Sequence, residues 1–82
     1  MASRERNVSL VLQCMRTQEC QIYFEPEGSD HTLKEGDLFD VMISGPGSGK
    51  VEIAFLPKGL IVGGWSGSST RVRNRAGEDL RT

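Results

Sequence analysis

Hydrophobic and polar residues alternate with a period of two through three consecutive runs in the middle of the chain. This period is that of a β-strand, in which successive side chains point to opposite faces of a sheet. The first two runs, residues 38–43 and 51–56, are separated by a loop rich in glycine and proline, which favours a hairpin. The expected pairs are Ile43 with Val51, Val41 with Ile53, and Phe39 with Phe55, and all six side chains are expected to face the core.

The turn at Pro57, Lys58 and Gly59 sets the register of the third run, which extends from Leu60 to Trp65. Proline can occupy the second position of a type I turn, and glycine can adopt the left-handed conformation that follows in a three-residue loop. A two-residue loop would need positive φ at Lys58, which its Cβ resists. The sequence therefore predicts a three-residue loop, which turns the tryptophan of the third run into the core. The expected pairs are Phe55 with Ile61 and Val51 with Trp65.

The N-terminal part of the chain carries the same alternation. Apolar residues occupy every second position of residues 8–14 and again of residues 20–24. We expect these runs to form a hairpin with its loop at residues 15–19, which places Cys14 opposite Cys20. Neither cysteine has a histidine or lysine beside it in the sequence to activate a thiolate. Two small, buried thiols are therefore expected, rather than a redox pair.

These registers leave an apolar outer face on the central sheet, and that face is too apolar for contact with water. One alternative is that the chain covers it by packing into a curled barrel. The other is that it contacts a protein partner or a second copy of the chain, because so short a chain can hardly cover both faces of a sheet. A non-enzymatic protein interaction module is the leading functional prediction. The predicted interface residues are Leu38, Met42, Leu56, Leu60 and Val62.

Length and composition set the class of the protein. The chain has 82 residues, enough for one hydrophobic core, and its short runs are punctuated by 10 glycines and 3 prolines, as is typical of all-β folds. We expect an all-β fold, a small antiparallel sandwich or partly open barrel of about six to seven short strands. The expected single domain spans residues 7–80, between a flexible leader at residues 1–6 and a tail at residues 81–82. Neither a secretory signal nor a membrane-spanning run is recognised, so we expect a cytoplasmic protein without membrane contact.

Charge is segregated along the chain. Residues 25–52 contain seven acidic residues and two lysines, whereas residues 70–82 contain four arginines and two acidic residues. If the run after residue 70 is a strand, three of its arginines share a face at about 6.6–6.8 Å spacing, comparable to successive phosphates of a nucleic-acid strand. A nucleic-acid-binding domain is therefore the alternative function, although arginines on a solvated edge strand are the simpler interpretation. The residues of this alternative are Arg71, Arg73, Arg75 and Trp65.

Patterns for catalysis, metals and nucleotides are weak. The glycine-rich loop at residues 45–50 lacks the spacing of a phosphate-binding loop, and a strand is expected after it instead of a helix. His31 and the two cysteines lack zinc-site spacing and a fourth ligand, and the acidic turn at residues 25–30 lacks calcium-site spacing. With one histidine and no nucleophile beside a base, we expect no enzyme activity, no catalytic residues, no cofactor and no metal.

Overall fold

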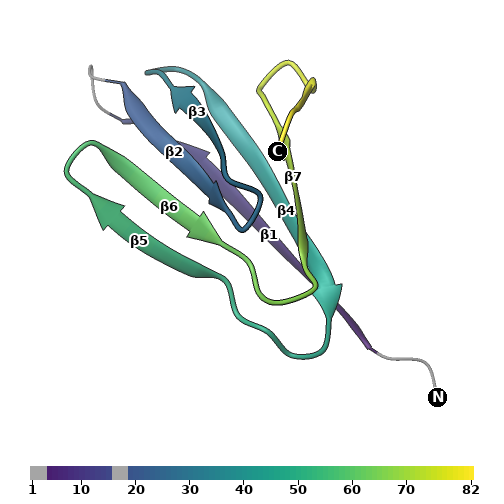
Figure 1. Cartoon of the computed structure of the whole chain (residues 1–82). Coiled ribbons are helices and arrows are strands. Elements are labelled where there is room, and N and C mark those ends of the chain that lie inside the picture. The colour runs from purple at the N-terminus through teal and green to yellow at the C-terminus, as the bar shows by residue number, and fades with distance from the viewer. Residues whose placement is uncertain (1–3, 16–18) are drawn as a thin grey trace.

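A computed structural model describes residues 4–15 and 19–82, which form two four-stranded β-sheets packed face to face (Figure 1). This arrangement confirms the predicted all-β class and shows a sandwich. The described residues form eight strands, somewhat more than the six to seven expected. They are β1 (Glu5–Gln13), β2 (Cys20–Glu25), β3 (Ser29–Leu33), β4 (Leu38–Pro46), β5 (Glu52–Leu56), β6 (Gly59–Gly63), β7 (Ser69–Arg73) and β8 (Asp79–Leu80).

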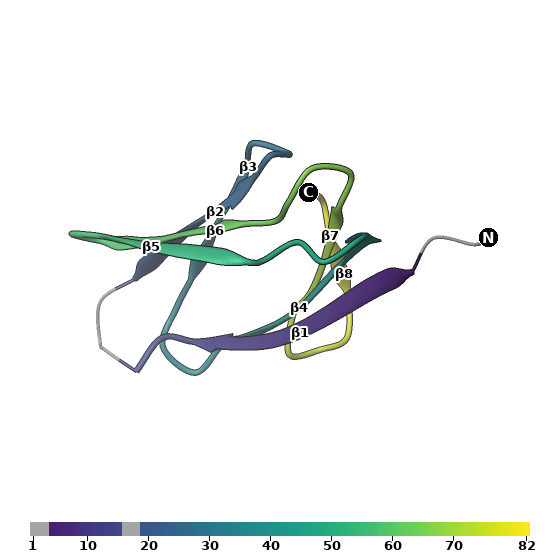
Figure 2. The same ribbon diagram turned by 90° about the horizontal axis from the view of Figure 1, so that it is seen from below.

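The first sheet has the strand order β1-β4-β7-β8 and the second has the order β3-β2-β6-β5. Neighbouring strands are antiparallel, except that β2 and β6 run parallel. The chain changes sheet between β1 and β2, between β3 and β4, between β4 and β5, and between β6 and β7, so the two layers are interleaved in sequence (Figure 2).

The hydrophobic core lies between the inner faces of the two sheets. Alternation explains it, because every second residue of the longer strands points inward. Phe24 and Ile22 from the second sheet and Ile43 and Val41 from the first are among the largest fully buried side chains. The whole buried cluster is Cys14, Ile22, Phe24, Leu33, Phe39, Val41, Ile43, Val62 and Val72.

Two of the three hairpins predicted from adjacent runs are wrong, and the third, β5–β6, does form. β1 pairs with β4 and β2 pairs with β3 and β6, so Cys14 and Cys20 lie in or beside different sheets. Likewise β4 pairs with β1 and β7, whereas β5, among the strands of the described residues, pairs only with β6. The predicted inward faces of residues 8–14, 20–24 and 39–43 were nevertheless the right ones. Two runs that share a core can meet across a sandwich as well as within a sheet, and alternation is the same in both cases.

The predicted register of the β5–β6 hairpin is also wrong, by one residue. Leu56 lies opposite Gly59, which leaves a two-residue loop of Pro57 and Lys58. No residue other than glycine has positive φ among the described residues, so this loop avoids the mirror-image turns that Lys58 would resist. The slip reverses the faces of β6, because side chains alternate. As a result Val62, predicted at an interface, is 1% exposed.

The ends of the domain are tied to its body. β1 begins at Glu5, inside the predicted leader, where it lies opposite Pro46. In the predicted tail, the Thr82 hydroxyl donates a hydrogen bond of 2.7 Å to the Thr70 carbonyl. His31 Nε2 donates one of 2.6 Å to the Arg81 carbonyl, so this half-buried histidine holds the last residues in place.

Ile43 and Ile53 provide a matched test of the corrected arrangement. Ile43→Ala is expected to lower the free energy of unfolding by about 2–5 kcal/mol, because the removed atoms leave a cavity in the core. Ile53→Ala is expected to cost only about 1 kcal/mol, because Ile53 is 42% exposed whereas Ile43 is 0% exposed. Urea unfolding followed by circular dichroism measures both values, and equal losses would contradict this packing.

Candidate functional site

Strand β5 is the most exposed apolar strand of the sandwich. It forms an edge of the second sheet, and all five of its residues are exposed. Its sequence, EIAFL, contains four apolar residues and a single charge at Glu52. The side chain of Phe55 is 83% exposed, which is unusual for a phenylalanine in a strand. Natural edge strands are usually blunted by charges, proline or shortness, and β5 lacks most of this protection.

Backbone hydrogen bonds of β6 show which way its polar groups point. The Gln21 N–H donates to the Lys58 carbonyl at 3.0 Å, and the Gly64 N–H donates to the Glu25 carbonyl at 3.0 Å. Since the direction of the backbone groups alternates along a strand, the even-numbered residues between 58 and 64 face β2. The odd-numbered residues of β6 therefore face β5.

Each odd-numbered residue of β6 lies opposite an even-numbered residue of β5. The even-numbered residues of β5 consequently bond to β6, and the odd-numbered residues point the other way. Ile53 and Phe55 thus direct their N–H and C=O groups away from β6, in the plane of the sheet and beyond its edge. No strand of the described part of the chain pairs with them there. The open edge offers both main-chain hydrogen bonds and apolar side chains.

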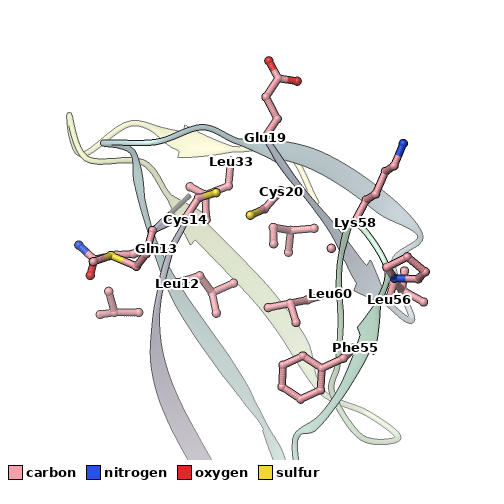
Figure 3. A pocket seen from close by; sticks show the side chains of 15 residues that line it. Leu12, Gln13, Cys14, Glu19, Cys20, Leu33, Phe55, Leu56, Lys58 and Leu60 are labelled. Carbon is pink, nitrogen blue, oxygen red and sulfur yellow. The ribbon is translucent and has the colours of Figure 1, made fainter. Parts of the chain in front are cut away.

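A cleft of about 860 Å³ separates the end of β1 from the β5–β6 hairpin. Phe55 lies opposite Leu60 on the inner face of the second sheet, but the first sheet ends at β1 and does not cover it. Figure 3 shows Leu12, Leu60 and Phe55 pointing into this opening from its two sides. The opening therefore continues the core to the surface beside the β5 edge.

Charged side chains flank the cleft without entering it. Lys58, in the turn after β5, and Glu19, just before β2, point away from the apolar lining in Figure 3. Glu52 begins β5, so an acidic and a basic group stand near the two ends of the same short strand. The two ends of the edge therefore differ in charge, and the strand between them is apolar.

The structure does not bring the predicted interface residues together. Leu38 and Met42 lie on β4 in the first sheet, whereas Leu56 lies on β5 in the second. Leu60 is half-buried against the core and Val62 belongs to it. The interface prediction grouped residues that do not share a surface, because it treated β4 and β5 as neighbours. It also placed Ile53 and Phe55 in the core, since alternation gives their face but not whether another sheet covers it.

The arginines of the nucleic-acid alternative are engaged in local contacts. Arg71 and Arg73 share the outward face of β7, as predicted, and both approach the carboxylate of Asp79. The Arg73 Nε donates to Asp79 Oδ1 at 2.9 Å, and the Arg71–Asp79 distance is 3.7 Å. Arg75 lies beyond the strand and donates from its Nε to the Gly36 carbonyl at 2.9 Å. A carboxylate thus offsets part of the positive charge that a phosphate would need.

Trp65 lies in the loop between β6 and β7, half-buried against the core. Its indole Nε1 donates to the Pro46 carbonyl at 2.8 Å, and a Cβ at Gly49 would overlap its ring. The inward direction agrees with the prediction, although the residue is in a loop instead of a paired strand. Arg71 and Arg73 line a separate depression of the surface from that lined by Trp65, so the four residues of the alternative do not form one site.

Other candidate chemistry is explained by packing. The loop after β4 crosses from one sheet to the other, and Gly49 lets the Trp65 ring lie against its backbone, so the predicted hairpin loop is not the reason for this glycine. In the acidic turn, Glu27 accepts a hydrogen bond of 2.9 Å from the Thr70 N–H.

Within residues 4–15 and 19–82, no group of three or more histidine, cysteine, aspartate or glutamate residues is placed to hold a metal ion. The described residues include no helix with the length and hydrophobicity that a membrane crossing requires.

Gly49→Ala tests the seat of the tryptophan. The added methyl group is expected to displace the indole, lower the free energy of unfolding by about 1–3 kcal/mol and shift Trp65 emission to longer wavelength. Gly63→Ala is the control, because the nearest atom to its Cβ would be at 3.7 Å. Fluorescence and urea unfolding measure both effects, and parent-like values for Gly49→Ala would show that Trp65 does not pack there.

Comparison of the chain with protein-family models, with curated proteins and with solved structures finds no match. A functional proposal for this protein therefore depends on the geometry of the β5 edge and its cleft.

Proposed function

We propose that the protein is a non-enzymatic protein-interaction module that binds an extended polypeptide segment along the open edge of β5. One observation carries the proposal: β5 is an exposed, apolar edge strand whose residues Ile53 and Phe55 direct backbone groups outward, where none of the described strands pairs with them. Addition of a strand to such an edge is a common mode of peptide recognition, in which main-chain hydrogen bonds supply affinity.

The cleft beside the edge supports a polypeptide as the ligand. An added strand would alternate its side chains, so every second one would lie on the inner face beside Phe55 and above the cleft. Covering an exposed phenylalanine contributes about 1.5–3 kcal/mol, and each net hydrogen bond about 0.5–1.5 kcal/mol. Apolar residues at alternate positions are therefore the expected specificity of the ligand.

Nucleic acid is the less favoured ligand for this protein. Binding to phosphates requires several cationic groups in one place, and β5 itself carries only an acidic residue. The arginines of β7 lie in the other sheet and contact Asp79. They remain exposed, so a titration with oligonucleotides belongs in the same experiment.

Random linear peptides displayed on phage provide a direct test. Selection on the immobilised protein is expected to enrich peptides with apolar residues at alternate positions. A synthetic peptide from the enriched set, titrated into isotope-labelled protein, is expected to shift the backbone amides of residues 51–59. Shifts confined to residues 70–76 would contradict the proposal, and the same shifts with random single-stranded oligonucleotides, fading as salt rises, would favour nucleic acid.

Two variants at one position separate backbone from side-chain recognition. Phe55→Pro removes an outward N–H without touching the bonds to β6, so it is expected to abolish peptide binding while the fold is kept. Phe55→Ala keeps the N–H and is expected to weaken binding about tenfold through the lost apolar contact. Amide spectra verify that each variant is folded, and unchanged affinity in folded Phe55→Pro would rule out this edge.

A further inference from the structure

We propose that the segment bound at this edge is β5 of a second copy of the chain, paired antiparallel in a register centred on Ala54. The inference rests on the proposed function and adds the identity of the partner strand. Its basis is that β5 is complementary to itself in backbone direction and in side chains, and that its single charge, Glu52, does not meet its own copy.

The backbone geometry comes first. A twofold axis perpendicular to the sheet and passing beside Ala54 overlaps the whole of β5 with β5 of the second copy. Ile53 then lies opposite Phe55 of the second copy, and Ala54 lies opposite itself. Because Ile53 and Phe55 both direct their backbone groups outward, these two residues exchange both hydrogen bonds in each of the two symmetry-related pairs.

The side chains match in the same register. Residues directly opposite each other in a sheet share a face, so Ile53 of one copy packs beside Phe55 of the other on the inner face. The two exposed phenylalanines, each 83% exposed in the single chain, thereby become covered. On the outer face the small Ala54 side chains meet at the axis and leave room for close approach.

Charge favours this register over its neighbours. In this register Glu52 of one copy lies opposite Leu56 of the other, so the two Glu52 side chains are kept apart at opposite ends of the paired strands. A register centred on Ile53 would instead make the two Glu52 side chains diagonal neighbours. A register centred on Phe55 would set Ile53 opposite Pro57, which has no N–H to donate.

Self-pairing also accounts for an edge that is left unprotected. An isologous contact uses the same strand on both copies and closes after two, so each dimer hides both of its β5 edges. An apolar edge that remained open would be a template for continued association. The second copy is therefore the occupant that the composition of β5 fits best.

Cysteine crosslinking tests the register. In Ala54→Cys the two new cysteines would face each other in a pair without hydrogen bonds, with Cα atoms about 4.5 Å apart, within the range of a disulfide. Mild oxidation is expected to give a reducible covalent dimer. Glu52→Cys is the matched control, because its symmetry mate would be about 14 Å away along the strand and no crosslink should form. The parent under the same oxidant measures any reaction of Cys14 and Cys20.

Analytical ultracentrifugation tests the dimer without crosslinking. The parent is expected to show a concentration-dependent equilibrium between monomer and dimer, and Phe55→Pro to raise the dissociation constant at least about tenfold. A parent that stays monomeric while selected peptides still bind residues 51–59 would overturn the self-pairing and leave the proposed function standing. A monomeric parent without peptide binding would overturn both. Preferential crosslinking at position 52 would overturn the proposed register. A dimer that persists in folded Phe55→Pro would overturn pairing through the β5 edge.

Discussion

Face-to-face packing of the two inner sheet faces is the interaction on which the rest of the structure depends. Phe24 and Ile22 from one sheet meet the layer of Val41 and Ile43 from the other, and these side chains are almost completely buried. The hairpins β2–β3, β5–β6 and β7–β8 each lie within one sheet, so no single hairpin can complete this core. The sandwich therefore requires contacts between residues that are distant in the sequence, such as the pairing of β1 with β4.

The limited width of the first sheet decides where the core ends. The first sheet stops at β1, and the second extends past it to β5, so the inner face of β5 stays uncovered. Three of the four edge strands have features that discourage the pairing of a further strand. The edge strand β8 has only two residues, β3 carries Asp30 and His31, and β1 begins with Glu5 and Arg6. β5 has the smallest fraction of polar residues, one in five, which is why the functional proposal is placed there.

Two arginines of the basic C-terminal run have a local partner in the fold. Arg71 and Arg73 lie on the outward face of β7, beside the Asp79 carboxylate of β8. The groups are more than half exposed, and surface ion pairs of this kind contribute only about 0–1 kcal/mol each. Their role is consistent with orienting a short last strand, and the apolar packing of Val72 and Leu80 beneath them contributes more to holding it.

The sequence by itself determined the class of the fold and, for much of the chain, which side of each strand faces the core. Alternation identified the inward residues of β2 and β4, including Phe24 and Ile43, because side-chain direction is a local property of an extended backbone. Only the tertiary structure decided which strands are neighbours, since the same alternation serves pairing within a sheet and packing across a sandwich. It also decided the exposure of Phe55, because whether an inward residue is buried depends on how far the opposite sheet extends. The candidate site follows from that second kind of information, which no local pattern contains.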